Sequence, residues 1–182
     1  MRKVLLLIGL LAVMGSPVLA FTCDFEGLPT TYYYFYGMQN IGGYYPGVTF
    51  GPTCYILDAV IGGYNSGGYP PHSGNAVAVS IGTSYIRADF AQATDHVDVW
   101  YTEGYGNGLW LDAYDSGGTL IASANGPTNY GYNAQLSVDA AGIAYVLIHN
   151  EGDYFTIDDF TFNEGPSPAE PNTWGSIKGL FR

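Results

Sequence analysis

The chain has 182 residues, of which 47% are hydrophobic and 12% charged, so its composition is not that of a disordered protein. Its formal net charge is −11, and beyond residue 20 it has 16 acidic side chains against only Arg87, Lys178 and Arg182 as basic ones. Such a surface repels phosphate backbones, which argues strongly against nucleic-acid binding, and it favours divalent cations.

The first twenty residues have the pattern of a signal peptide. Met1-Arg2-Lys3 is a basic start, residues 4–13 are almost wholly apolar, and cleavage is expected after Ala20. A membrane anchor is the alternative, but the apolar run is short for a membrane span, and no later segment approaches that length. We therefore expect an exported protein, secreted or held at the cell surface, that is not transmembrane. Residues 21–163 would form its single domain.

Cys23 and Cys54 are the only cysteines of the chain. In an exported protein an even pair predicts one disulfide, and two buried free thiols are the alternative.

Short alternating segments between Gly-, Pro- and Asn-rich turns predict strands along the domain. We expect them at about 21–25, 48–50, 54–61, 76–81, 85–90, 96–101, 109–114, 119–122, 132–138, 143–148 and 155–162. Asp115-Ser116-Gly117-Gly118 predicts a hairpin turn. Residues 143–148 are apolar on both faces, which predicts a central strand covered on each side. No helical period occurs before residue 165, so the fold class is all-β, an antiparallel β-sandwich.

The last predicted strand contains two adjacent acids. Phe155 and Ile157 share one face, and so do Phe160 and Phe162, but three residues separate Ile157 from Phe160. A β-bulge at Asp158-Asp159 would bring both apolar pairs into one core. Two carboxylates beside a core need neutralising, so the pair either binds a cation or forms an exposed acidic step.

Two short segments follow the domain. Residues 164–171 form a Pro-rich linker, which its prolines extend. Residues 172–182 could form a short amphipathic helical tail, which is too short to be stable alone. The tail is either a frayed end or a sorting or recognition tag.

Four motifs spread over the domain suggest a family. They are Asp24-Phe25-Glu26-Gly27-Leu28-Pro29, Pro71-His72-Ser73-Gly74-Asn75-Ala76-Val77, Leu111-Asp112-Ala113-Tyr114-Asp115-Ser116-Gly117-Gly118 and Phe155-Thr156-Ile157-Asp158-Asp159-Phe160. Their order resembles the galactose-binding-like jelly roll of carbohydrate-binding modules and exported bacterial surface proteins, including PEP-CTERM-type proteins. The tail contains Glu170-Pro171 but lacks the hydrophobic span and terminal basic cluster of that sorting system, which is therefore not assigned. The resemblance implies a sandwich of jelly-roll type.

The resemblance also implies a structural calcium, which in such domains often lies where the first and last strands meet. Its side-chain ligands would be Glu26 and either Asp158 or Asp159, with Asp24 as the competing acid of the first strand. Carbonyl groups near Ser73-Gly74 would complete the shell. Added calcium would then raise the melting temperature, and a chelator would lower it.

No catalytic residues are expected, because the sequence has no HExxH, GxSxG, P-loop or CxxC motif and its three histidines are scattered. Sugar-binding jelly rolls stack sugar rings on exposed aromatic side chains. The candidate ligand-binding residues are Trp110, Tyr45, Tyr69 and Tyr105, with Arg87 as a polar anchor or as an ion-pair partner. Loop tyrosines that only cover the edges of the sandwich are the alternative.

Trp110 alternates out of phase with Leu109 and Leu111, so it points away from their side, either onto a binding face or into packing with a second sheet. The expected function is that of an exported, non-catalytic cell-surface or matrix binding module, with carbohydrate as the expected ligand class. The alternative is a structural or adhesive extracellular protein that self-associates.

Overall fold

The computed structural model describes residues 19–28, 40–58, 67–104, 106–152 and 154–163. Its strands are β1 (Ala20–Cys23), β2 (Val48–Phe50), β3 (Cys54–Asp58), β4 (Ala76–Ser80), β5 (Tyr85–Glu103), β6 (Leu109–Tyr114), β7 (Leu120–Gly126), β8 (Ala134–His149) and β9 (Phe155–Asn163). These residues contain no helix, and thus none long and apolar enough to cross a membrane. The predicted all-β fold is confirmed. The predicted linker and helical tail lie outside the described residues, and so does the predicted signal peptide except for Leu19 and Ala20, the second of which begins β1.

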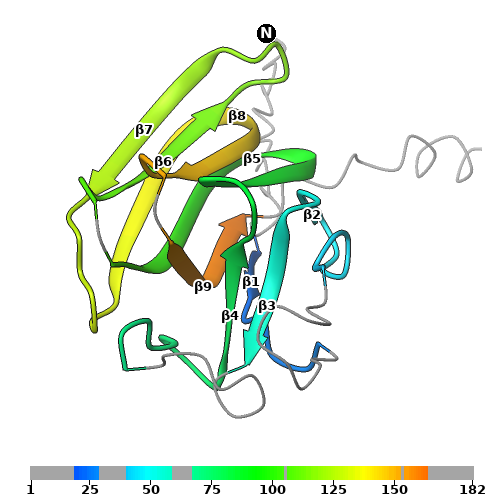
Figure 1. Cartoon of the computed structure of the whole chain (residues 1–182). Coiled ribbons are helices and arrows are strands. Elements are labelled where there is room, and N and C mark those ends of the chain that lie inside the picture. The colour runs from blue at the N-terminus through cyan, green and yellow to red at the C-terminus, as the bar shows by residue number, and fades with distance from the viewer. Residues whose placement is uncertain (1–18, 29–39, 59–66, 105, 153, 164–182) are drawn as a thin grey trace, which may run out of the picture.

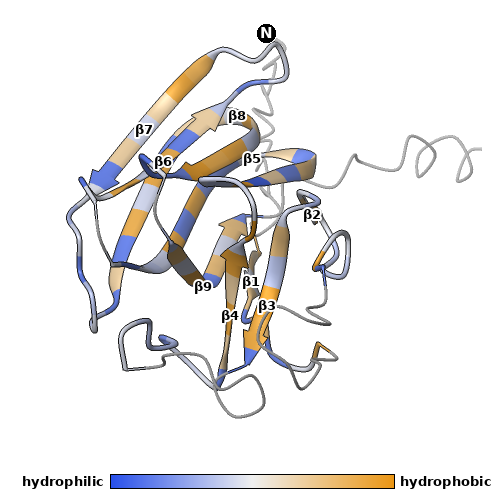
Figure 2. Cartoon of the chain, in the orientation of Figure 1, coloured by the Kyte–Doolittle hydropathy of each residue, from blue (hydrophilic) through white to orange (hydrophobic). Residues whose placement is uncertain are grey.

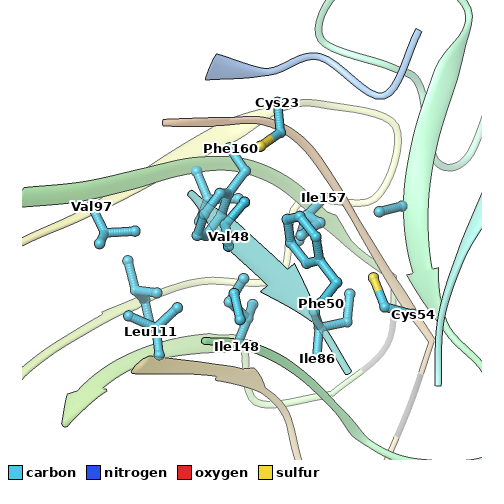
Figure 3. Close-up of a cluster of buried hydrophobic side chains, with 14 of the residues drawn as sticks. Cys23, Val48, Phe50, Cys54, Ile86, Val97, Leu111, Ile148, Ile157 and Phe160 are labelled. Carbon is cyan, nitrogen blue, oxygen red and sulfur yellow. The ribbon is translucent and has the colours of Figure 1, made fainter. Parts of the chain in front are cut away.

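The strands pair antiparallel in one sheet of order β3-β4-β9-β5-β8-β6-β7, with β1 added on β9 and β2 on β5. The sheet folds over on itself, so that β5, β8, β6 and β7 lie in one layer and β3, β4, β9 and β1 lie in the other (Figure 1). One apolar core lies between the layers. Figure 3 shows Leu111 and Ile148 of the first layer on one side of the cluster, and Phe50 and Phe160 on the other.

Two strands are much longer than predicted. The expected strands at 85–90 and 96–101 are joined in β5, and those at 132–138 and 143–148 are joined in β8. Register shifts between Asp89 and His96 interrupt the pairing of β5 with β8. Irregularities of this kind bend a strand and increase its twist, so β5 and β8 can contribute to both layers without a break in the chain.

The first and last strands of the domain are neighbours, as the sequence predicts. Ala20 pairs with Asn163, and Cys23 pairs with Phe160. The predicted bulge in β9 is also confirmed, because Asp98 pairs with Thr161 while Trp100 pairs with Asp158. Between these two pairs, the chain advances by three residues along β9 but by only two along β5. The apolar side chains on both sides of the bulge all lie in the core, namely Phe155, Ile157, Phe160 and Phe162.

The predicted disulfide is wrong, because Cys23 and Cys54 are separate free thiols in this structure, and both are buried. Cys23 ends β1 and pairs with Phe160 of β9, whereas Cys54 begins β3 and pairs with Ser80 of β4. The two sulfur atoms lie on different sides of the cluster in Figure 3. Burial raises the pKa of both thiols, which keeps them protonated and unreactive at neutral pH.

The prediction that residues 143–148 are covered on both faces is wrong. Val146 and Ile148 are fully buried, but Tyr145, Leu147 and His149 alternate with them and are only half-buried. Figure 2 shows the same alternation of hydrophilic and hydrophobic residues along the long strands. The strand is central in the sheet, yet only one of its faces packs into the core. Its other face carries the candidate site.

Candidate functional site

The side chains of β5, β8, β6 and β7 that point away from the core form what we call the outer face. Their cross-strand pairing sets three rows, which are Tyr85–His149–Trp110–Asn125, Arg87–Leu147–Asp112–Ser123 and Asp89–Tyr145–Tyr114–Leu120. The alternate residues of β5, β6 and β8 are buried, because successive side chains of a strand point to opposite faces. The outer face thus combines aromatic, acidic and basic groups on regular strands.

Tyr145 lies at the centre of a stack across three strands. The Arg87 guanidinium carbon is 3.8 Å from the centre of the Tyr145 ring, and the Tyr114 ring stacks on Tyr145 at 4.8 Å with an interplanar angle of 5°. Arg87 also donates two charge-assisted hydrogen bonds to Asp89, from Nε at 2.9 Å and from Nη2 at 2.6 Å. Because β8 lies between β5 and β6, both faces of the Tyr145 ring are covered. This stack orders the face but leaves Tyr145 no ring surface for a ligand.

The Trp110 row is more open. Trp110 stacks on His149 at a centroid distance of 5.9 Å and an angle of 14°. Nε2 of His149 lies 3.0 Å from Oδ2 of Asp112, and the Ser123 hydroxyl donates to Oδ1 of Asp112 at 2.5 Å. Tyr85, on the other side of His149, is 43% exposed. The row therefore offers two aromatic rings beside a carboxylate that its neighbours hold in place.

A polar pocket lies at the end of the strands, beside the turn between β4 and β5 and the loop after β8. It has a volume of about 310 Å³ and is lined by Ser80, Gly82, Thr83, Ser84, Gly152 and Tyr154. The N–H of Asn150 donates to the Ser84 carbonyl at 3.1 Å, which joins the two loops that form its walls. Since Ser84 directly precedes Tyr85 and Asn150 directly follows His149, the pocket lies beside the strand ends that carry Tyr85 and His149.

The structure brings together only two of the predicted ligand-binding residues. Trp110 and Arg87 both lie on the outer face, and Trp110 points away from Leu109 and Leu111 as expected. Tyr45 is only 8% exposed, packs edge-on against Phe25 and belongs to the core, so it is not placed to stack a ligand ring.

Tyr69 lies apart from the outer face. It packs at 90° against Tyr130 and covers a small apolar cluster of Leu57, Val77 and Val79 on the far side of β3 and β4. Tyr105 lies outside the described residues.

The sequence interpretation missed the other aromatic and ionisable residues of the outer face, which are Tyr85, Asp89, Asp112, Tyr114, Tyr145 and His149. A signal for them was present, because Tyr85, Arg87 and Asp89 share a strand face by their spacing of two, and so do Trp110, Asp112 and Tyr114. The sequence does not show the strand register that places these residues of β5 and β6 on either side of β8.

The predicted metal ligands gather around the loop before β4, which runs from His72 to Asn75. Oδ2 of Asp158 accepts hydrogen bonds from the N–H groups of His72 at 2.7 Å and Ser73 at 2.9 Å. Oδ2 of Asp159 lies 2.6 Å from Nδ1 of His72, and its Oδ1 accepts a hydrogen bond from the Ser73 hydroxyl at 2.9 Å. The His72 ring in turn stacks on Trp100 at 3.7 Å. The bulge of β9 therefore fixes the start of the loop.

Glu26 fixes the other end of the same loop. Its Oε1 accepts hydrogen bonds from the N–H groups of Asn75 and Ala76, both at 2.7 Å. Gly74 has φ +55°, and a Cβ at this position would lie 2.3 Å from Oε1 of Glu26, so a side chain would displace the carboxylate. Asp24 does not take part: it accepts hydrogen bonds from the Glu26 N–H at 3.2 Å and the Tyr45 hydroxyl at 3.4 Å.

These residues do not fit the predicted calcium in their present arrangement. Both oxygens of Asp158 accept backbone N–H groups, the second from Asp159 at 2.8 Å, whereas a calcium shell needs oxygen ligands turned toward the ion. Among the described residues, no group of three or more His, Cys, Asp and Glu side chains is placed to hold a metal ion. The loop directs N–H groups at the carboxylates, whereas the calcium prediction expected its carbonyl groups to face an ion.

No protein-family model matches the sequence, and no curated protein matches it. Among solved structures, the K2 cleaved adhesin domain of Lys-gingipain is similar with a TM-score of 0.47 and 15% identity over 80% of this chain and 100% of that one. TmCBM61 in complex with beta-1,4-galactotriose has a TM-score of 0.37 and 19% identity over 64% and 87%. CsCBM6-3 from Clostridium stercorarium in complex with cellobiose has a TM-score of 0.39 and 15% identity over 76% and 99%.

These neighbours are adhesin and carbohydrate-binding domains, the kinds of protein that the sequence motifs resemble. TM-scores and identities this low carry no conclusion about what this chain binds.

Proposed function

We propose that the chain is an exported, non-catalytic binding module of jelly-roll type and that its outer face binds carbohydrate. The observation that carries the proposal is the Trp110 row, where two partly exposed aromatic rings flank His149 beside the fixed carboxylate of Asp112. A sugar ring has apolar C–H faces that pack on aromatic rings and hydroxyls that hydrogen-bond to neighbouring polar groups.

The polar groups within the face suit hydroxyl recognition. Asp112 supplies acceptor oxygens, Asn125 supplies both donors and acceptors, and Arg87 supplies donors. The acidic character of the chain, with a net charge of −11, opposes anionic glycans. The ligand class that fits best is therefore a neutral polysaccharide, with Trp110 and Tyr85 as stacking surfaces.

Affinity electrophoresis and pull-down with neutral polysaccharides, together with a glycan array, test this function. We expect Trp110→Ala and Tyr85→Ala each to reduce binding by about 5- to 150-fold, since loss of a stacking aromatic costs about 1–3 kcal/mol. Tyr132→Ala is the matched control, because Tyr132 is 74% exposed and lies on the loop before β8. Binding that survives both substitutions on the face, or a wild-type protein that binds no neutral glycan, would contradict the proposal. Release of sugar by the wild type would contradict its non-catalytic part.

A further inference from the structure

Strand β7 forms one end of the sheet and pairs only with β6 among the described strands (Figure 1). In an antiparallel ladder, alternate N–H and C=O groups of an end strand point away from its one partner. The opposite end of the sheet is covered, because Asn40 bridges to Tyr55 of β3 and the Asn40 side-chain amide donates to the carbonyls of Pro52 at 2.8 Å and Cys54 at 3.0 Å. The described residues include no such cover on β7.

The side chains of β7 are also incompletely covered. β7 is the one described strand without a fully buried residue. Ile121, Ala122 and Ala124 pack against the core but stay partly exposed, and Leu120 is 50% exposed. Folded proteins commonly protect a sheet edge with charged residues or proline, and the sequence Leu-Ile-Ala-Ser-Ala-Asn-Gly of β7 contains neither.

We propose that two copies of this chain pair antiparallel through β7. The contact would be centred on the regular run Ala122–Gly126, since the register shift at Tyr114 leaves Ile121 out of the ladder. A two-fold axis at Ala124 sets Ser123 opposite Asn125 and Ala122 opposite Gly126 of the second copy. This pairing gives the outward N–H and C=O groups of both β7 strands hydrogen-bond partners and covers the partly exposed apolar side chains.

The lack of charge on β7 makes it the strand through which two copies can meet. Two copies of so acidic a chain repel each other wherever acidic side chains meet. The other strands of the same layer all carry acids, such as Asp89 on β5, Asp112 on β6 and Asp139 on β8. β7 carries no charge, so two β7 strands can meet without placing like charges directly opposite one another. The proposal does not depend on carbohydrate binding.

Sedimentation velocity of the full exported protein, over a concentration series without ligand, tests the pairing. We expect a wild-type dimer that dissociates on dilution. Asn125→Glu and Asn125→Lys should each be monomeric, because the two Asn125 side chains lie diagonally across the axis, about 7–8 Å apart for such a pair. An equimolar mixture of the two variants should recover the dimer. Ser116→Glu and Ser116→Lys, in the exposed turn before β7, are the matched controls and should dimerise like the wild type.

The mixture keeps the test independent of folding, since two misfolded variants would not restore a dimer. A wild type that is monomeric at every concentration would overturn the proposal. So would variants at Asn125 that dimerise as well as the wild type, or a mixture that stays monomeric. Loss of glycan binding would leave this result unchanged and would bear only on the outer face.

Discussion

At the scale of single residues, Asp158 is the buried acid among the predicted metal ligands Glu26, Asp158 and Asp159. It is 1% exposed, and burial raises its pKa from 3.8 to about 6, against the lowering effect of the Ser73 N–H group. His96 lies between two acids on the other half of β5. Burial lowers its pKa, but the hydrogen bonds to Asp139 and Asp98 outweigh that effect, so its pKa is raised. Both groups hold protons more tightly in the folded state.

Folding stability should therefore fall as the pH rises through the titration of Asp158. Its folded pKa lies above its unfolded value, so its contribution is complete below about pH 4 and is lost by about pH 6. We expect Asp158→Asn to flatten this part of the pH profile by roughly 1–3 kcal/mol, since one pKa unit corresponds to about 1.4 kcal/mol. Urea unfolding at a series of pH values measures it.

Asp95→Asn, on an exposed acid of β5, is the control for the pH profile and should leave its slope in place. An unchanged slope in Asp158→Asn would show that other groups set the acid dependence.

How far single residues could be predicted depended on whether they lie in regular strands. Trp110 could be assigned to a face because its neighbours Leu109 and Leu111 fix the alternation. Tyr45 could not, because it lies in an irregular segment that folds back over the core, where spacing gives no direction. Tyr69, another candidate in a loop, likewise lies apart from the outer face, where it covers the apolar cluster of Leu57, Val77 and Val79.

At the scale of elements, the bulge of β9 follows from spacing alone, because four apolar side chains with a three-residue step cannot share a face otherwise. The structure adds its conformation, with Asp159 at φ +42°. The turn after β6 was equally predictable: the Asp115 carboxylate accepts N–H groups from Gly117 at 2.9 Å and Thr119 at 2.8 Å. The exposed face of β8 could not be predicted, because Tyr145 and Leu147 are residue types that also occur in the core.

The conformation of Asp159 predicts an inverted preference between glycine and alanine. In a regular strand, glycine is less stable than alanine by roughly 0.5–1 kcal/mol. At positive φ the Cβ is strained by about 1–2 kcal/mol, so Asp159→Gly should be more stable than Asp159→Ala by about 1 kcal/mol. Both variants lose the same carboxylate, so their difference isolates the backbone. Chemical denaturation measures it.

Ser137, an exposed residue of β8, provides the matched pair for this comparison. Ser137→Ala should be at least as stable as Ser137→Gly. The same order at position 159 would mean that no bulge of this conformation is present there.

At the scale of the whole molecule, the all-β class and the meeting of the first and last strands could be predicted, because both rest on alternation and half-burial at the two ends. The state of the two cysteines could not be predicted, since expected export to an oxidising compartment shows only that a disulfide could form. The folded sheet places Cys23 and Cys54 on strands that β4 and β9 separate.

Thermal unfolding of the whole protein decides between the predicted calcium and the hydrogen-bonded arrangement of the structure. Since backbone N–H groups already occupy Oδ2 of Asp158 and Oε1 of Glu26, the arrangement of the structure predicts the same melting temperature in calcium and in a chelator. A fall in the chelator that added calcium reverses would contradict this expectation. It would show that an ion reorganises the loop around these acids and stabilises the folded state by mass action.

The position of β9 has a consequence for how the protein is made. This strand is hydrogen-bonded to β1, β4 and β5, and it is the last of the described strands to be synthesised. A chain that emerges with its amino end first therefore lacks the middle of one layer until residue 163 has appeared. We therefore expect the layer of β1, β3 and β4 to assemble only after β9 has been made, whereas β5, β6, β7 and β8 can pair with one another earlier.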